Sequence, residues 1–149
     1  MEVNRIDHIS IAVRDLDGAR SAWEPILGKS GPDELYVHEP ESIRVARYWV
    51  GGVALELMES TTPDGPVARW IEAHGEGIMV LSLNVENTKK AMEELEPMGY
   101  PFVPSTTGDK LRPFRGCQFA FIHPGKLNGV LLEIIDKKKG GHGLGSANL

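Results

Sequence analysis

The sequence has almost no cysteine, few aromatic residues and no long apolar run. Cys117 is the single cysteine among 149 residues, which excludes an internal disulfide and a thiolate metal cluster. Because Cys117 falls inside an apolar stretch, we expect it to pack rather than to react. No apolar stretch is long enough to span a membrane, and the N-terminus opens into a strand pattern rather than a signal peptide. We therefore expect a cytoplasmic protein with no membrane partner.

The sequence also lacks an excess of basic residues. Lysine and arginine total 16, against 21 aspartate and glutamate residues, which gives a formal net charge of −5. No basic stripe is present, so we expect no nucleic-acid partner. With 41% hydrophobic and 25% charged residues, the composition is typical of one soluble domain.

The chain repeats itself. A shift of 72 residues places Ser10 on Ser82, and a shift of 77 places the stretch 52–57 on 129–134, so that Glu56 meets Glu133. Repeats usually indicate solenoids, but two copies are too few to stack. We interpret them as two modules closed into one domain by a pseudo-twofold axis. Matched residues are then expected to converge on the centre of that domain.

Each module is predicted to have the order β-α-β-β-β from its hydrophobic periodicity and turn residues. In the first module we expect a strand at 5–13, a helix from Asp15 to Gly28, and strands at 35–38, 43–50 and 53–59. In the second we expect a strand at 77–85, a helix at 87–98, a short strand at 101–103, and strands at 117–122 and 129–135. The predicted domain spans 1–135, with module one at 1–60, a linker with a short helix at 61–76, module two at 77–135 and a flexible tail at 136–149.

Two glutamates stand among apolar residues on strands that we expect to be central. Side chains alternate between the two faces of a strand, and this alternation places Glu56 and Glu133 on the same kind of face as His8, Ser10 and Ser82. A buried carboxylate without a partner is costly, and a divalent cation is one possible partner. A lone strand histidine is more often a hydrogen-bonded structural residue than a ligand. The two matched glutamates shift that balance, so we favour a metal.

The other histidines are weaker candidates. We expect His38 and His74 at the surface and His142 in the tail, whereas His123 either lines a cavity mouth or caps a turn. Five basic residues could bind anionic groups of a substrate, although solvated surface charge is an equally good interpretation. They are Arg44, Arg47, Arg112, Arg115 and Lys126.

At this point the sequence resembles the vicinal oxygen chelate superfamily, which includes glyoxalases and bleomycin-resistance proteins, and within it the methylmalonyl-CoA epimerases. The stretches that carry the resemblance are 6–16, 54–57, 68–71 with 75–78, 119–124 and 129–133. The resemblance implies an α+β fold in which two β-α-β-β-β modules form a cupped eight-stranded mixed sheet with the helices outside. It also implies a divalent metal ion, a small-molecule substrate and a homodimer.

Transferred to this sequence, the resemblance keeps three metal-ligand positions, His8, Glu56 and Glu133. The fourth falls on Val80, where the epimerases typically have a histidine, and Val80 is also the repeat mate of His8. Cobalt, manganese, zinc or nickel could be the metal. One histidine with two carboxylates favours harder ions such as Mn²⁺ or Co²⁺.

The function implied is an isomerase that resembles methylmalonyl-CoA epimerase. A bound cation would stabilise an enolate while Glu133 and Glu56 remove and return the proton alpha to a carbonyl of a 2-substituted acyl-CoA or a similar acid. A glyoxalase I-type lyase and a metal-free small-molecule binding protein of the same fold are the alternatives. An iron dioxygenase is disfavoured, because its usual triad of two histidines and one carboxylate is not available at these positions.

Overall fold

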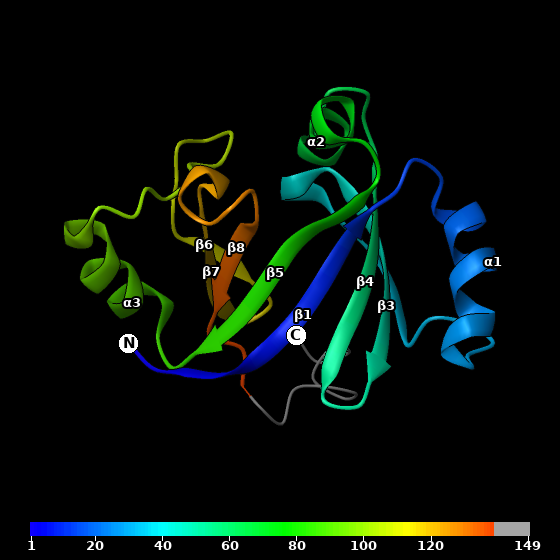
Figure 1. Ribbon diagram of the computed structural model, residues 1–149, viewed down its shortest axis with the longest axis horizontal. Coiled ribbons are helices and arrows are strands. Elements are labelled where there is room, and N and C mark those ends of the chain that lie inside the picture. The colour runs from blue at the N-terminus through cyan, green and yellow to red at the C-terminus, as the bar shows by residue number, and fades with distance from the viewer. Residues whose placement is uncertain (139–149) are drawn as a thin grey trace. The chain divides into compact units, whose positions relative to one another are not determined.

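The computed structural model describes residues 1–138, and these residues form eight strands and three α-helices (Figure 1). The strands are β1 (Val3–Ala12), β2 (Glu34–His38), β3 (Ile43–Val50), β4 (Val53–Ser60), β5 (Gly77–Val85), β6 (Arg112–Phe114), β7 (Cys117–Ile122) and β8 (Leu131–Ile135). The helices are α1 (Leu16–Leu27), α2 (Pro66–His74) and α3 (Thr88–Leu95), with short 3₁₀ helices at Glu39–Glu41, Glu96–Met98 and Pro124–Lys126. None of the helices in this part of the chain has the length and apolar character needed to cross a lipid bilayer.

The strands follow the order β2-β3-β4-β1-β5-β8-β7-β6 in one sheet. Strands β5 and β8 are parallel, whereas β3 and β4 are antiparallel, so the sheet is mixed. The predicted α+β class with an eight-stranded mixed sheet is therefore confirmed. By its internal contacts the chain divides into two units, Ile9–Met79 and Met1–His8 together with the chain from Val80 onward. Strands β1 and β5 each contribute residues to both units.

In the unit Ile9–Met79, helix α1 covers strands β3 and β4 (Figure 1). The helix begins after Asp15 and ends at Gly28, as predicted, and Gly28 adopts the left-handed conformation (φ 68°) that a helix end of this type requires. The β3–β4 hairpin turns at Gly51, which also has positive φ (63°). The buried core beneath α1 consists of Ile11, Val13, Leu16, Ala46, Tyr48 and Leu57.

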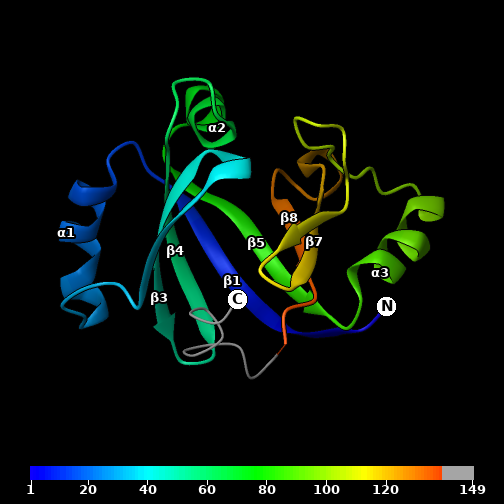
Figure 2. The same ribbon diagram turned by 180° about the vertical axis from the view of Figure 1, so that it is seen from behind.

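In the other unit, helix α3 packs on β7 (Figure 2). Asn87 caps the helix because its side-chain oxygen accepts a hydrogen bond from the Lys90 backbone N–H at 2.9 Å. Strand β8 lies between β5 and β7, parallel to the first and antiparallel to the second. The buried core of this unit consists of Val85, Ala91, Met92, Leu95, Phe102, Ala120, Ile122 and Ile134.

The short strand predicted at 101–103 is wrong. Phe102 forms only an isolated bridge with Ile122, and the strand that pairs with β7 is β6. Prolines at both ends of this stretch have no N–H to donate, which limits the ladder there. The chain instead reverses at Arg115 and Gly116, whose positive φ angles (44° and 84°) suit a two-residue hairpin turn.

The first residues of the predicted tail are held by the fold. The carboxylate of Asp136 accepts hydrogen bonds from the backbone N–H groups of Gln118 (2.7 Å) and Thr88 (3.1 Å), and Lys137 is buried. The packed chain therefore continues to Lys137, beyond the domain end predicted at 135. Residues 139–149 lie outside the described residues.

A buried tyrosine anchors α1 to the sheet. The Tyr48 hydroxyl donates to Glu24 Oε2 at 2.6 Å, and Arg20 Nε donates to the same oxygen at 2.9 Å. These two hydrogen bonds hold the pKa of Glu24 below its ordinary value. Burial, followed by the Glu24 hydrogen bond, raises the pKa of Tyr48.

We predict that Tyr48→Phe lowers the free energy of unfolding by about 1–2 kcal/mol, because it removes a hydrogen bond to a carboxylate. Urea denaturation at pH 7 measures this. Tyr100→Phe is the control, since the Tyr100 hydroxyl has no hydrogen bond to the described residues, and it should change stability little. The pKa of Glu24 is lowered on folding, so the difference between Tyr48→Phe and the parent should shrink as the pH falls below the ordinary Glu24 pKa of 4.5. A loss that is equal at pH 7 and pH 3 would contradict the assignment.

Candidate functional site

In the unit Ile9–Met79, three charged residues form a row across neighbouring strands. Glu34 on β2 is the register partner of Arg47 on β3, and Arg47 is the register partner of Glu56 on β4. Directly opposed residues project to the same face of a sheet, so the row places the guanidinium beside both carboxylates. Arg47 is only 2% exposed, and Glu56 is also buried.

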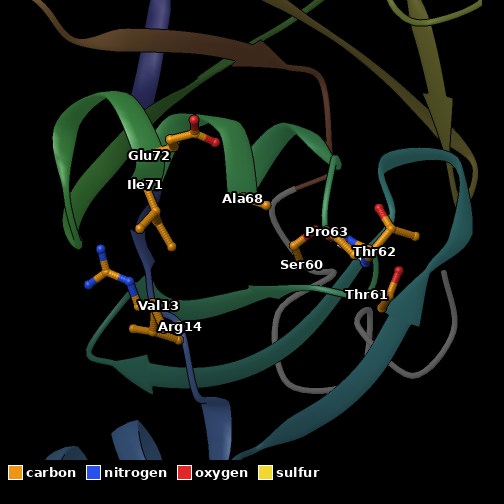
Figure 3. A pocket seen from close by; sticks show the side chains of 9 residues that line it. All are labelled: Val13, Arg14, Ser60, Thr61, Thr62, Pro63, Ala68, Ile71 and Glu72. Carbon is orange, nitrogen blue, oxygen red and sulfur yellow. Dashed lines mark hydrogen bonds between the residues drawn. The ribbon is translucent and has the colours of Figure 1, made fainter.

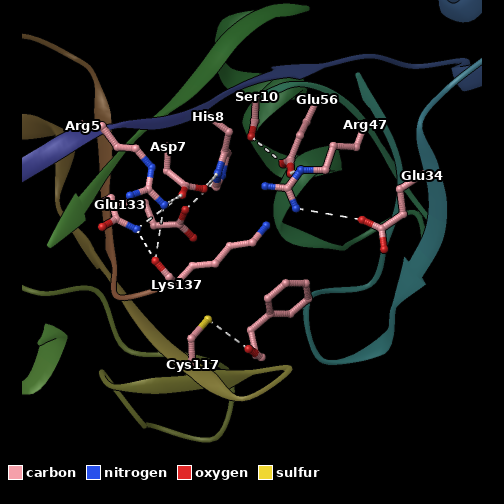
Figure 4. A network of polar contacts seen from close by, with 12 residues as sticks. Arg5, Asp7, His8, Ser10, Glu34, Arg47, Glu56, Cys117, Glu133 and Lys137 are labelled. Carbon is pink, nitrogen blue, oxygen red and sulfur yellow. Dashed lines mark hydrogen bonds and ion pairs between the residues drawn. The ribbon is translucent and has the colours of Figure 1, made fainter. Parts of the chain in front are cut away.

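Glu56 is held by two partners, one in this row and one on β1 (Figure 4). Ser10 Oγ donates to Glu56 Oε1 at 3.0 Å, and Arg47 Nε lies 3.4 Å from Glu56 Oε2. Arg47 Nη1 also lies 4.0 Å from Glu34 Oε1, and its guanidinium stands 5.2 Å from the centre of the Trp49 ring. Because a guanidinium stays protonated in proteins, the charge of Glu56 is compensated by a permanent internal cation.

In the other unit, three ionisable groups form a chain (Figure 4). Asp7 Oδ2 lies 2.8 Å from His8 Nδ1, and His8 Nε2 lies 3.0 Å from Glu133 Oε1. All three side chains are buried. A carboxylate that is hydrogen-bonded to Nδ1 fixes the orientation of an imidazole ring. Asp7 therefore directs Nε2 of His8 toward Glu133.

Asp7 is itself anchored by the strands around it. Arg5 Nη2 lies 3.7 Å from Asp7 Oδ1, and Asn84 Nδ2 donates to the same oxygen at 3.5 Å. Asn84 Nδ2 and Arg5 Nη2 also donate to the carbonyl oxygen of Lys137, at 2.7 Å and 3.4 Å. The end of the described chain therefore closes over the Asp7 carboxylate.

The two glutamates that the repeat matches have different neighbours. The register partner of Glu56 on β3 is Arg47, whereas the register partner of Glu133 on β7 is Phe121. Glu133 therefore has an aromatic ring in the place where Glu56 has a cation. Its ionisable neighbour is the imidazole of His8, whose Nε2 lies 3.0 Å from Glu133 Oε1. The sequence repeat predicts equal roles for the two carboxylates, and the structure gives them unequal surroundings.

The donor set fits a divalent cation only in part. His8 Nε2 and Glu133 Oε1 face each other, and the Asp7 contact is the support that a metal-binding imidazole usually has. Glu56 does not fit, because Ser10 and Arg47 already engage its oxygens. Among residues 1–138, no three histidine, cysteine, aspartate or glutamate side chains are grouped so that they could hold a metal ion. The described residues thus supply two suitable donors.

The remaining sequence candidates lie elsewhere. Val80 is buried on β5, in register with Leu131 of β8. Arg44 pairs with Glu59 at 2.9 Å, and Lys126 is exposed. Each of the other two candidate arginines lies over an aromatic ring, Arg112 over Phe121 at 5.0 Å and Arg115 over Phe114 at 5.2 Å.

Of the two interpretations of His123, the turn cap is confirmed, because its Nδ1 accepts a hydrogen bond from the Gly125 N–H at 3.0 Å. His74 is exposed, as predicted, and stacks on Trp70 with ring centres 4.1 Å apart. Cys117 Sγ donates to the Phe114 carbonyl oxygen at 3.0 Å, and burial raises the pKa of this thiol to about 12. A thiol that stays protonated is a poor nucleophile, which agrees with a packing role.

A pocket of about 560 Å³ opens in the unit Ile9–Met79, between α2 and the end of β4 (Figure 3). Its apolar part includes Ile71 and Pro63, and its polar part includes Arg14, Glu72 and Thr62. None of the predicted site residues lines it. Two opposite charges on its wall give it no strong preference for anions or cations.

The order of the strands in the sheet is typical of a protein built from two paired β-α-β-β-β modules. Comparison with known proteins identifies the family. Residues 7–121 match the model described as the Glyoxalase/Bleomycin resistance protein/Dioxygenase superfamily, and the chain belongs to that superfamily.

Individual relatives are consistent with this. The uncharacterized protein YqjC of Bacillus subtilis is 33% identical over 140 residues, which cover 94% of this chain and 97% of that protein. Human mitochondrial methylmalonyl-CoA epimerase is 26% identical over 133 residues, covering 89% of this chain and 73% of the human protein. A solved variant of the Streptomyces coelicolor methylmalonyl-CoA epimerase, in complex with 2-nitronate-propionyl-CoA, aligns with a TM-score of 0.80 at 25% identity, covering 91% of this chain and 98% of that one. The predicted similarity to methylmalonyl-CoA epimerases is confirmed.

We predict that Arg47→Met lowers the free energy of unfolding by about 3–5 kcal/mol, because it leaves the buried Glu56 without its guanidinium. Chemical denaturation at pH 7, followed by circular dichroism, measures the loss. Arg44→Met is the matched control on the same strand: Arg44 is 36% exposed, and removing its ion pair should cost less than about 1 kcal/mol. The double variant Arg47→Met with Glu56→Gln should recover part of the loss. Equal losses in the two single arginine variants would contradict the charge compensation described above.

Proposed function

We propose that this protein is an isomerase that removes and returns the proton alpha to a carbonyl of a 2-substituted acyl-CoA or a similar acid. The chain Asp7–His8–Glu133 carries the proposal, because it places a buried carboxylate against an oriented imidazole. The substrate class is supported by the relatives, one of which is a methylmalonyl-CoA epimerase and another of which was solved with an acyl-CoA derivative.

In this proposal Glu133 is the base that removes the alpha proton. A carboxylate acts as a general base when a substrate proton comes within hydrogen-bond distance of one of its oxygens. His8, held by Asp7, keeps the Glu133 carboxylate in place and stabilises its charge. Phe121 excludes a second charged partner from the register position beside Glu133.

Epimerisation also requires that a proton return from the opposite face of the substrate. That Glu56, the repeat mate of Glu133, carries out this step stays a prediction from the sequence. Its two partners, Ser10 and Arg47, hold the carboxylate in a fixed orientation.

A divalent metal ion held by His8, Glu56 and Glu133 stays a prediction from the sequence. Because the described residues supply only two suitable donors, no step of the proposed reaction is routed through a metal. The homodimer and the cytoplasmic location also stay predictions.

A second candidate function is metal-free binding of a small molecule. The observation that favours it is the internal cation: Arg47 already compensates Glu56, so the unit Ile9–Met79 needs no metal to bury that carboxylate. For a binding protein, ligand affinity should survive both His8→Ala and Glu133→Gln. Isothermal titration calorimetry on these two variants separates the candidates.

We predict different effects for the two glutamates on the proton chemistry. In deuterated water with the stereoisomer of methylmalonyl-CoA whose alpha proton faces Glu133, Glu133→Gln should reduce exchange of that proton by at least about 100-fold, because a general base contributes roughly 10²–10⁴-fold. Glu56→Gln should retain exchange from one stereoisomer and lose inversion, because the remaining base returns the deuteron to the face from which it took the proton. Proton NMR follows exchange, and chiral analysis of the product follows inversion. Undiminished exchange in Glu133→Gln would refute the assignment of the base.

We predict that Val80→His strengthens metal binding if Val80 occupies a lost ligand position. An added imidazole donor should raise the affinity for Zn²⁺ or Co²⁺ by roughly tenfold or more. Calorimetry measures the affinity, and the metal-dependent rise in melting temperature reports the same change. Val80→Leu is the control for crowding at this buried position. A folded Val80→His variant with the metal affinity of the parent would remove Val80 from the predicted ligand set.

A further inference from the structure

Ser82 and its repeat mate Ser10 differ in their hydrogen bonds. Ser10 Oγ donates to Glu56 Oε1 at 3.0 Å. Ser82 is 0% exposed, and its hydroxyl has no hydrogen-bond partner among the described residues. A buried hydroxyl without a partner is unfavourable, and natural structures retain few of them.

The position of Ser82 is next to the proposed reacting group. Ser82 on β5 is the register partner of Glu133 on β8, and neighbouring strands lie roughly 4.8 Å apart. Partners in register project to the same face, so the Ser82 side chain stands on the face from which Glu133 meets His8. In the other unit, the matched serine and glutamate bond to each other, whereas here they do not.

We propose that the Ser82 hydroxyl binds the ligand: it donates a hydrogen bond to the carbonyl oxygen of an acyl group whose alpha carbon faces Glu133. This inference rests on the proposed function. It names the chemical class of the ligand at this point, a thioester or acid with a proton alpha to its carbonyl. The buried hydroxyl then gains the acceptor that the described residues do not provide.

The hydrogen bond would act on the charge that develops during the reaction. When Glu133 accepts the alpha proton, the electron pair of the C–H bond moves toward the carbonyl, and negative charge accumulates on the carbonyl oxygen. A hydroxyl donor to that oxygen binds it more strongly as the charge grows. Return of a proton to the alpha carbon restores the C–H bond and the neutral carbonyl. Ser82 itself gains and loses no proton.

The first part of the test uses the protein without ligand and compares Ser82→Ala with Ser10→Ala. Ser10→Ala removes a hydrogen bond to a buried carboxylate and should lower the melting temperature by roughly 3–8 °C. Ser82→Ala removes a hydroxyl that has no partner and should leave the melting temperature unchanged or raise it. A fall after Ser82→Ala as large as that after Ser10→Ala would mean that the hydroxyl has a protein partner, and it would overturn the inference.

The second part measures ligand binding and proton exchange, with methylmalonyl-CoA and free CoA as the probes. Ser82→Ala should weaken binding of methylmalonyl-CoA by about tenfold, the effect of one lost hydrogen bond. It should leave the affinity for free CoA unchanged, because free CoA has no acyl carbonyl. Exchange of the alpha proton at saturating methylmalonyl-CoA should fall further, by roughly 10²-fold, if the bond strengthens as charge develops. Ser82→Cys keeps the size of the side chain with a weaker donor and should lie between serine and alanine.

The outcomes separate this inference from the proposed function. If the parent protein binds methylmalonyl-CoA and exchanges its proton, but Ser82→Ala does both equally well, Ser82 is not a ligand-binding residue and the proposed function stands. If the parent neither binds nor exchanges methylmalonyl-CoA, the proposed function fails, and the ligand assigned to Ser82 fails with it. Loss of binding to both probes in Ser82→Ala would indicate a general disturbance of the site and would also overturn the inference.

Discussion

A carboxylate on an inner strand of a sheet must have its charge compensated, and this requirement shapes both units of the protein. In one unit the compensation comes from a guanidinium on the neighbouring strand, in register with Glu56. In the other it comes from an imidazole that a second carboxylate orients toward Glu133. A guanidinium keeps its charge under all ordinary conditions, so the charge of Arg47 beside Glu56 is permanent.

Much of the fold follows from the sequence because its signals are local. The helix that starts after Asp15 and ends at Gly28 has a recognisable end residue, and the β3–β4 hairpin has the two-glycine turn that the sequence indicates. The repeat also identifies Glu56 and Glu133 as equivalent strand residues, and both are buried. The short strand predicted at 101–103 does not form, because the prolines at its two ends have no N–H groups with which to extend the ladder.

The partners of the site residues were harder to predict, because they depend on register between strands that are far apart in sequence. Arg47 was a candidate for binding anionic substrate groups, yet its register partners are two carboxylates of its own chain. Its position among apolar strand residues was a signal that it is buried and needs an acidic partner. Asp7 stands beside His8 in the sequence, and that adjacency could have suggested its role. No pattern in the sequence signals that Lys137 packs behind it.

The division of β1 has a consequence for how such a chain could arise. Val3–His8 belong to the unit that contains the chain from Val80, while the rest of the strand belongs to the unit Ile9–Met79. The chain from Val80 to Lys138, made on its own, would lack the segment Val3–His8, and it could obtain that segment only from another copy. Fusing two copies into one chain turns this exchange into an intramolecular event, at a high effective concentration of the missing segment. The register partners of Glu56 and Glu133, Arg47 and Phe121, show that the two halves need not carry the same buried charges.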